Sequence, residues 1–448
     1  MPSHLLQSVL ICVCLTASVS ADEPPETEAP GSRDQAEKIS DYELMELFVE
    51  TFQQIEANYV SEVDRRELME AAIQGMLGHL DQYSSFIPPR DVRRFNMMVE
   101  QEFGGIGITV NRNMRNRRLI VISPLPGTPA WRAGIRAGDA IVEVDGTPTS
   151  KMNLNDAVRR LQGPVGRPVT IKVVHPGKNA DPEEIKLVRQ LIKAPTVRGD
   201  HYDDNQKWEF MLQDEPKIGY VRLSNFSRFT AEEVREAVDG LVERKVQGLI
   251  IDLRFNPGGL LESAVEIADM FLEKGNIVSV RGRNVPSRSW DAEKVGTYPA
   301  MPIAVLVNGF SASASEVLSA ALQDNKRAVI IGERTWGKGS VQNVIRMEDG
   351  DSALKLTTAG YFRPSGVNIH REAEMTPQDD WGVTPDDGFL LPFTREEWDA
   401  WDRQRTGKDI LRHEGEEPAE TPEDTESDFQ DKHLTAAIDY LQKKLSEE

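Results

Sequence analysis

The sequence predicts a protein of the α/β class, in which a helical segment precedes the α/β core and a β-rich unit is inserted between them. Short apolar runs alternate with amphipathic helical patterns across residues 218–335, as in proteins whose sheet strands are joined by helices. Residues 102–176 contain short β-type runs separated by glycine-containing turns. Residues 41–82 carry apolar side chains at helical spacing, and 448 residues suffice for two or three domains.

Residues 1–21 are predicted to form a secretory signal peptide. They contain the only long apolar run, which ends in a small-residue cleavage pattern. No Lys or Arg precedes the run, which is the weak feature of a signal peptide here. An uncleaved membrane anchor is the alternative, although the run is short for a spanning helix of about 20 residues. Cys12 and Cys14 are the only cysteines, and both lie in this segment. The cleaved protein is therefore expected to have no disulfide and no reactive thiol.

The composition is acidic, with 73 Asp and Glu against 52 Lys and Arg and a net charge of −21. This balance argues against nucleic acid and anionic membranes as partners. Residues 22–40 form an acidic, proline-rich linker, and residues 41–100 form the N-terminal helical segment. After signal cleavage no membrane span is expected. We expect an extracytoplasmic protein, either periplasmic or secreted.

Residues 303–342 contain the strongest candidate for a catalytic site. A serine hydroxyl becomes a nucleophile when a base takes its proton, and Lys338, between two glycines, can be that base if burial keeps its amine neutral. Gln342 follows four residues later, where an extended chain places both side chains on one face. The serine is Ser313, at the start of a helix, where the Ala314 N–H could stabilise an oxyanion.

Two ordinary explanations stand beside this hypothesis. Ser313 to Glu316 is also a capping box, S-x-x-E before an apolar helix, and capping boxes are common. A lone lysine is usually a solvated cation. On local evidence the choice between a helix cap and a nucleophile stays open, and the G-x-S-x-G elbow of another hydrolase class is absent because residue 315 is a serine.

The longer pattern N-x-x-SASASE, ALQDN and GERTWGKGSVQ resembles the signature of the carboxyl-terminal processing peptidases, the tail-specific serine proteases of family S41. The resemblance implies that Ser313 is the nucleophile, that Lys338, 25 residues later, is the base, and that Gln342 completes the site. It also implies a catalytic core of the crotonase or Clp-protease type over residues 178–395. One departure is Phe310, where relatives often have a small residue; another is Gly360, where they often have arginine.

The segment DLR-x-NPGG, after an apolar run at residues 248–253, matches a second part of this family. A glycine turn between a strand and a helix presents free N–H groups, which suits an anion. The resemblance implies that a glycine amide here is the second oxyanion donor, and we assign it to Gly258 rather than to Gly259. A simple turn is the alternative.

Residues 101–177 resemble a PDZ domain of the type found in processing peptidases, through GGIGI, P-x-x-G-T-P-A, AGIRAGD-x-I and V-D-G. PDZ domains add a peptide to a sheet edge and capture its C-terminal carboxylate on backbone N–H groups. The resemblance assigns this role to a glycine-rich loop, in which glycine lets the backbone approach the ligand. The loop consists of Gly104, Gly105, Ile106 and Gly107. A tight turn without a ligand is the alternative.

The remaining residues suggest few other sites. His370 is the best rival base, but no spacing brings it to Ser313, and the 7 histidines form no metal-binding pattern. No metal or organic cofactor is implied. Residues 396–448 are expected to form an acidic linker and an amphipathic C-terminal helix, which could dock on the core or on a second subunit in a homo-oligomer.

These features predict a serine endopeptidase with a Ser–Lys dyad that cleaves exported proteins near their C-termini. Its partners would be unfolded or flexible protein C-termini, which the PDZ domain captures. One alternative is a non-catalytic PDZ scaffold that binds tails without cleaving them. A crotonase-type acyl-CoA enzyme would fit the core but not the export signal or the PDZ unit.

Overall fold

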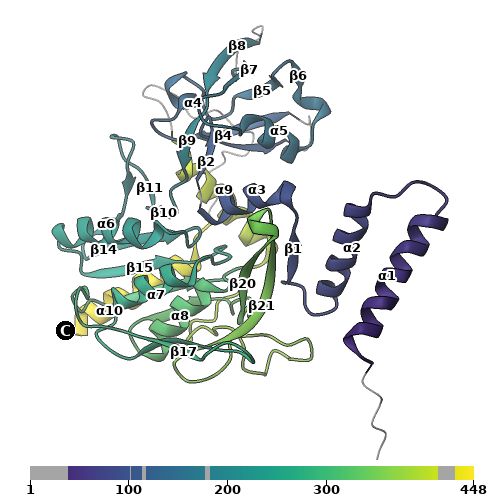
Figure 1. Cartoon of the computed structure of the whole chain (residues 1–448). Helices are drawn as coiled ribbons and strands as arrows, with labels where there is room; N and C mark the ends of the chain where they lie inside the picture. The colour runs from purple at the N-terminus through teal and green to yellow at the C-terminus, as the bar shows by residue number, and fades with distance from the viewer. Residues whose placement is uncertain (1–38, 101, 114–117, 177–181, 412–428, 448) are drawn as a thin grey trace, which may run out of the picture. The chain divides into compact units, whose positions relative to one another are not determined.

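The computed structural model describes residues 39–100, 102–113, 118–176, 182–411 and 429–447 (Figure 1). The predicted signal peptide and most of the two acidic linkers lie outside these residues. The chain divides into two compact units, Met1–Met69 and Glu70–Glu448. Among the described residues, no helix is both long enough and apolar enough to cross a membrane.

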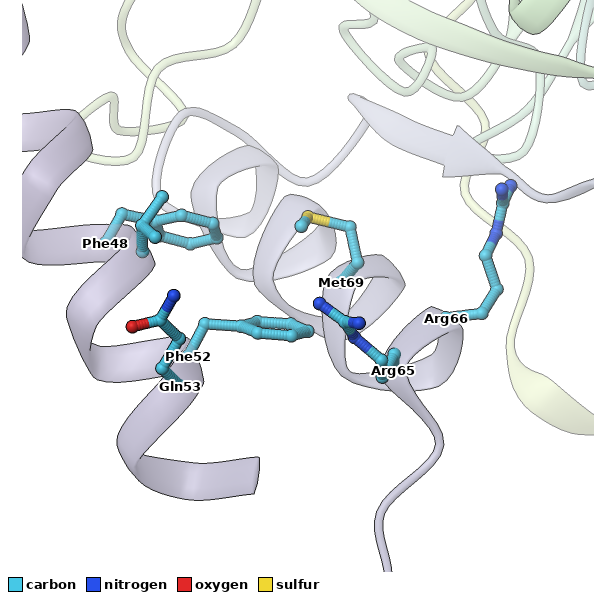
Figure 2. A pocket seen from close by; sticks show the side chains of 7 residues that line it. Phe48, Phe52, Gln53, Arg65, Arg66 and Met69 are labelled. Atoms are coloured by element: carbon cyan, nitrogen blue, oxygen red, sulfur yellow. The ribbon is translucent and has the colours of Figure 1, made fainter. Parts of the chain in front are cut away.

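The first unit contains α1 (Asp41–Asn58) and the first residues of α2 (Arg65–Gly78). A capping box between Ser40 and Glu43 starts α1. The expected helical stretch is thus two helices separated by residues 59–64. None of the α1 side chains is buried, and its apolar residues line an open pocket of about 420 Å³ (Figure 2). The pocket is lined by Phe48, Val49, Phe52, Gln53, Arg65, Arg66 and Met69.

The second unit contains the inserted β-domain, which has its own apolar core around Leu119, Ile141 and Ile171. Its main sheet has the order β3-β4-β5-β7-β8 with β6 beside β5, and β2 pairs separately with β9. The strands are β2 (Glu102–Gly105), β3 (Ile108–Arg112), β4 (Leu119–Pro124), β5 (Ala140–Val144), β6 (Thr147–Pro148), β7 (Pro168–Val174), β8 (Glu183–Val188) and β9 (Gln190–Lys193). The helices are α4 (Pro129–Arg132), η1 (Thr149–Lys151) and α5 (Leu154–Leu161).

The central sheet of the α/β core has the order β10-β14-β15-β18-β19, with β13 beside β14. The strands β14, β15, β18 and β19 are parallel, and β15 and β18 are buried throughout because helices cover both faces. The strands are β10 (Val197–Arg198), β13 (Met211–Asp214), β14 (Lys217–Leu223), β15 (Gly248–Asp252), β18 (Ile303–Val307) and β19 (Val329–Gly332). The covering helices are α6 (Thr230–Glu243), α7 (Leu261–Asp269), α8 (Ala314–Asp324) and α10 (Lys432–Glu447).

Two hydrophobic clusters show which helices cover which face of this sheet. The α6, α7 and α8 side chains join one cluster with Ile251 and Val305, whereas Ala437 and Leu441 of α10 join the other with Ile250 and Leu306. Neighbouring residues of a strand point to opposite faces, so α10 packs on the face opposite to the other three helices. The predicted C-terminal helix is therefore part of the core layer structure.

A second, antiparallel sheet carries part of the candidate site. Its order is β1-β21-β16-β17, and β20 pairs with β21 in a long hairpin. The strands are β1 (Ser85–Ile87), β16 (Asn276–Arg281), β17 (Arg288–Asp291), β20 (Ser340–Met347) and β21 (Ser352–Phe362). The other elements are α3 (Pro89–Glu100), β11 (His201–Tyr202), β12 (Trp208–Glu209), η2 (Glu348–Gly350) and α9 (Arg395–Asp409). Through β1, residues early in the chain pair with a strand of the catalytic region.

The α/β class with an inserted β-domain and an N-terminal helical segment is confirmed. The core strands and helices lie within a few residues of their expected positions. The polar stretch after residue 177, which falls within the range predicted for the catalytic core, contains β8 and β9, which pair with β7 and β2 of the inserted domain. The exposed positions of β8 are mostly charged. The overall polarity of the stretch therefore conceals the alternating pattern of buried and exposed residues that is typical of a half-buried strand.

Candidate active site

The predicted nucleophile, Ser313, lies in the turn between β18 and α8. Its backbone adopts φ 57° and ψ −114°, a conformation that costs a non-glycine residue about 1–3 kcal/mol and needs support from its surroundings. The Asn256 carbonyl oxygen supplies that support, because it accepts the Ala312 N–H at 3.0 Å and the Ser315 hydroxyl at 2.9 Å. The nucleophile turn is therefore fixed to the glycine loop that follows β15.

The buried carboxylate of Glu316 joins the two segments that carry the predicted dyad. Its Oε2 accepts the backbone N–H groups of Ser313 and Lys338, both at 2.8 Å. Its Oε1 accepts the Thr335 hydroxyl at 2.5 Å and the Gly337 N–H at 2.6 Å. Burial raises the pKa of Glu316 above its ordinary value, and these hydrogen bonds oppose the rise. One carboxylate thus holds the Ser313 and Lys338 backbones beside each other.

Glu316 had been singled out by the sequence only as the acidic end of a capping box. The backbone half of that box forms, since the Ser313 N–H donates to the carboxylate. The same carboxylate also reaches the Gly337-Lys338 backbone across the fold. Helix capping and assembly of the site are therefore functions of one residue, and local spacing could show only the first.

The Lys338 side chain is half-buried and points toward an aromatic ring. Burial and the charge of Lys355 hold the pKa of Lys338 below its ordinary value, against the opposing effect of Glu316. Its Nζ lies 5.1 Å from the centroid of the Tyr83 ring. In the described part of the chain, the amine makes no hydrogen bond to Ser313. The environment therefore favours the neutral amine.

Gln342 lies on β20, which begins two residues after Lys338. Its Nε2 donates to the Ser340 hydroxyl at 2.8 Å and to the Thr357 hydroxyl at 3.2 Å. The side chain is thus directed along the β20–β21 hairpin. Its expected contact with the Lys338 amine remains a prediction.

Gly258 lies directly against the nucleophile turn. Its φ is +99°, and a Cβ at this position would lie 2.6 Å from the Ala312 oxygen and 2.8 Å from the Ser313 Cβ, so only glycine fits. The same Cβ would lie 2.9 Å from the Ala314 nitrogen. The Gly258 N–H donates to Asn256 Oδ1 at 2.9 Å. Both predicted oxyanion donors therefore flank Ser313, and an oxyanion would have to share the Gly258 N–H with Asn256 or displace it.

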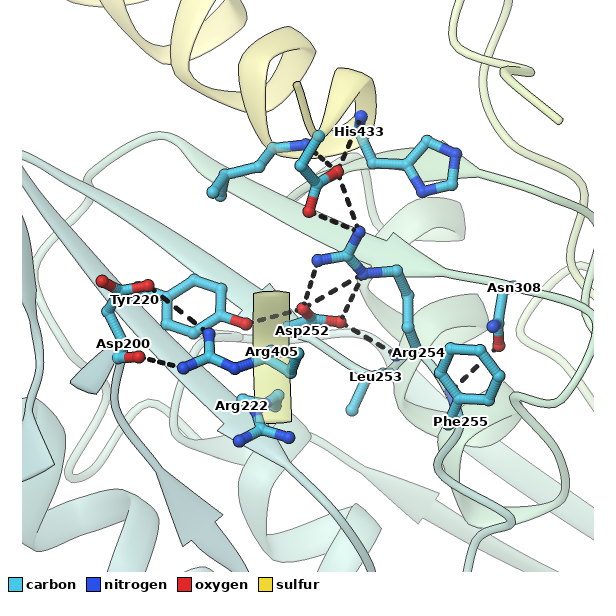
Figure 3. A network of polar contacts seen from close by, with 12 residues as sticks. Asp200, Tyr220, Arg222, Asp252, Leu253, Arg254, Phe255, Asn308, Arg405 and His433 are labelled. Carbon is cyan, nitrogen blue, oxygen red and sulfur yellow. Dashed lines mark hydrogen bonds and ion pairs between the residues drawn. The ribbon is translucent and has the colours of Figure 1, made fainter. Parts of the chain in front are cut away.

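A buried ionic network lies at the base of this glycine loop (Figure 3). Arg254 makes ion pairs with Asp252 at 2.7 Å and with Asp431 at 2.9 Å, and its side chain is 1% exposed. Asp252 also accepts the Tyr220 hydroxyl at 2.7 Å. Arg254 further stacks its guanidinium over the Trp401 ring. The loop that carries Gly258 is thus connected to α9 and to the residue that precedes α10.

Tyr361 of β21 is a neighbour of the nucleophile that the sequence analysis did not single out. Burial raises the pKa of Tyr361 to about 12, the charge of Glu262 adds to this rise, and a hydrogen bond with the Ser313 hydroxyl opposes it. Its phenol is therefore protonated at neutral pH. The sequence drew attention only to the neighbouring Gly360, and nothing in the local sequence indicates that this tyrosine faces Ser313.

His370, the rival base, packs against Tyr83 in an edge-to-face arrangement with a centroid distance of 6.2 Å. Its backbone N–H donates to Asn368 at 3.0 Å. Among the described residues, the ring contact of His370 is thus with Tyr83. Among the described residues, no group of three or more His, Cys, Asp or Glu side chains is arranged to hold a metal ion.

The predicted carboxylate loop lies in the inserted domain. Gly104 and Gly105 end β2, Ile106 is 2% exposed, and Gly107 has φ +78°. The Ile106 carbonyl accepts the Ala130 N–H at 2.9 Å, which anchors the loop from its carbonyl side. The capture of a carboxylate by these residues remains a prediction.

Three family models match the chain. They are described as "Peptidase family S41", over residues 217–387, "PDZ domain", over residues 120–174, and "Activating protease CtpB N-terminal domain", over residues 14–88. The first match contains every predicted catalytic residue. The second covers most of the inserted β-domain.

Curated relatives match over most of their length. A carboxy-terminal-processing protease of Bartonella bacilliformis is 39% identical over 77% of this chain and 75% of the relative. A carboxyl-terminal-processing protease of Synechocystis is 34% identical over 73% of this chain and 72% of the relative. Among solved structures, a photosystem II D1 C-terminal processing protease is 30% identical, with a TM-score of 0.43 and coverage of 79% of this chain and 94% of that one.

Proposed function

The chain belongs to peptidase family S41 and is a serine-type peptidase, and from this premise we propose that it cleaves exported proteins near their C-termini with a Ser313–Lys338 dyad. The observation that carries the proposal is the Glu316 carboxylate, which accepts backbone N–H groups from both Ser313 and Lys338 on one oxygen. Burial, the largest cause, lowers the pKa of Lys338, which is the direction that a lysine base requires.

In the proposed reaction, the neutral Lys338 amine takes the proton of the Ser313 hydroxyl while the oxygen attacks the carbonyl carbon of the scissile peptide bond. The oxyanion receives hydrogen bonds from the Ala314 and Gly258 N–H groups. When the C–N bond breaks, the Lys338 ammonium gives its proton to the leaving amine. A water molecule then loses a proton to Lys338 and attacks the acyl-enzyme ester. When the ester C–O bond breaks, Lys338 returns this proton to the Ser313 oxygen and is neutral again. Gln342 is proposed to orient the Lys338 amine.

The proposed substrates are exported proteins with unstructured tails, in an extracytoplasmic compartment. The PDZ domain would capture the terminal carboxylate through Gly104, Gly105, Ile106 and Gly107 and so raise the local concentration of the cleavable segment near Ser313. This order of events accounts for a binding domain and a hydrolytic core in a single chain.

The test compares the full-length enzyme with Ser313→Ala and Lys338→Ala on an unfolded substrate with an apolar tail, and reads the products by mass spectrometry. Both variants are expected to lose cleavage while still binding the tail. Retained cleavage in Ser313→Ala or in Lys338→Ala would exclude the dyad. Tail binding without cleavage by the wild type would instead favour a peptide-binding scaffold.

A further inference from the structure

The Lys338 amine has an aromatic neighbour that no step of the reaction above uses. Its Nζ lies 5.1 Å from the centroid of the Tyr83 ring, within the range of a cation–π contact. The described residues offer this amine no ion pair. A half-buried ammonium without a carboxylate partner is costly, and an aromatic face is one of the few groups that can stabilise it without holding it permanently charged.

Tyr83 is firmly positioned by the turn in which it lies. Asp81 Oδ1 accepts the backbone N–H groups of Tyr83 and Ser84, both at 2.7 Å, and Oδ2 accepts the Ser84 hydroxyl at 2.8 Å. Burial raises the pKa of Asp81, but these hydrogen bonds outweigh burial and lower it overall, so the carboxylate stays ionised. The turn leads directly into β1, which pairs with β21.

The same turn is also connected to Gln342. The Ser84 hydroxyl accepts the Thr357 N–H at 3.1 Å, and the Thr357 hydroxyl in turn accepts the Gln342 side-chain amide at 3.2 Å. His370 also packs against the Tyr83 ring, in an edge-to-face arrangement. The turn that carries Tyr83, about 250 residues before Lys338 in the sequence, therefore lies beside the Lys338 side chain, and its hydrogen bonds fix its position.

We propose that Tyr83 is a positioning residue for the Lys338 amine, and that its ring holds the ammonium whenever the amine has taken a proton. This inference rests on the proposed role of Lys338 as the base. In the acylation step, the proton leaves the Ser313 oxygen and the new N–H bond forms on Lys338. The ammonium is then stabilised over the ring until it gives the proton to the leaving amine.

The charges that face Lys338 set the sign of the expected effect. Lys355, from β21, disfavours the ammonium, and Glu316, from α8, favours it. The Tyr83 ring adds a second favourable contact from the segment before β1. Removal of the ring should therefore lower the pKa of Lys338. A general loosening of the site would instead let water in and raise this pKa toward its ordinary value.

The experiment measures the protonation of Lys338 without any catalysis. Full-length Ser313→Ala enzyme is treated with limiting acetic anhydride at a series of pH values, and mass spectrometry follows acetylation of the Lys338 peptide. Only the neutral amine reacts, so the midpoint of the rate reports protonation, while altered access changes only the amplitude. Tyr83→Leu is compared with Tyr83→Phe, which keeps the ring, and with Tyr42→Leu, a matched change at a position 76% exposed on α1.

We expect Tyr83→Leu to move the midpoint to lower pH by roughly 0.5 to 1.5 pH units, and Tyr83→Phe and Tyr42→Leu to keep the midpoint of the parent. With Ser313 present, the acid limb of kcat/KM for Tyr83→Leu should move in the same direction. An unchanged or raised midpoint in Tyr83→Leu overturns the inference even if Lys338 is the base. If Tyr83→Leu lowers the midpoint as expected but Lys338→Ala remains fully active, the Tyr83 contact is supported and only the proposed dyad is excluded.

Discussion

At the scale of single residues, Glu316 has the widest influence on the site. It is buried, and its four hydrogen bonds fix Ser313 and three residues of the lysine loop, Thr335, Gly337 and Lys338. An amide cannot replace it, because its NH2 group would face N–H donors. The geometry of the dyad therefore depends on the ability of this residue to accept hydrogen bonds with both oxygens.

We predict that Glu316→Gln lowers kcat by about 10- to 1000-fold and lowers the free energy of unfolding by about 2–4 kcal/mol, because two hydrogen bonds to a charged group are lost. Steady-state kinetics and urea unfolding measure the two effects. The control is Glu236→Gln on the exposed face of α6, which is expected to change neither. Wild-type kcat in Glu316→Gln would show that the carboxylate does not organise the dyad.

The pH dependence of the reaction is set by Lys338. A base must be neutral, so kcat/KM is expected to rise with pH as Lys338 loses its proton, and to level off above its pKa. Burial lowers this pKa, so the rise should occur below the value of about 10.4 that an exposed lysine has. A pH profile with an uncharged peptide substrate measures it, and a profile that falls over this range would contradict the assignment. Lys338→Arg, which cannot deprotonate, should be inactive at every pH.

At the scale of elements, the sequence predicted those parts of the site that are local. The strand at 303–307, the Ser313 turn and the glycine loop at 256–259 each carry a pattern that neighbouring residues determine. The contacts between these elements were not predictable, because Arg254 meets Asp431 across 177 residues, and Tyr83 meets Lys338 across an even greater separation. Nothing in the local sequence of either partner specifies the other.

The contact between Asp431, which precedes α10, and the glycine loop gives a prediction at this scale. Asp431→Asn leaves the buried Arg254 with only Asp252 as an ionic partner, and should lower the free energy of unfolding by about 2–4 kcal/mol. Urea unfolding measures this. Asp439→Asn, an exposed carboxylate on α10 itself, is the matched control and should change stability by less than about 0.5 kcal/mol. Equal effects of the two substitutions would mean that the Arg254 pair contributes nothing specific.

At the scale of the whole molecule, a PDZ domain and a peptidase core share one chain. If the PDZ loop binds the terminal carboxylate, then a substrate whose C-terminus is amidated should have a KM about 10- to 100-fold higher, with kcat unchanged, because the lost interaction is made equally before and during the reaction. Paired peptides that differ only in this group measure the effect. Identical KM values would show that the tail is recognised by its side chains alone.

The strand β1 pairs with β21, and Asp431 pairs with Arg254, so residues near both ends of the second unit contact the catalytic region. The match to the peptidase family spans only residues 217–387, which excludes both. A fragment limited to residues 217–387 would thus lack Tyr83, which lies beside Lys338, and Asp431, which pairs with Arg254. We expect the shortest active fragment to extend from about residue 81 to residue 447, so domain boundaries drawn from sequence similarity would yield an inert protein.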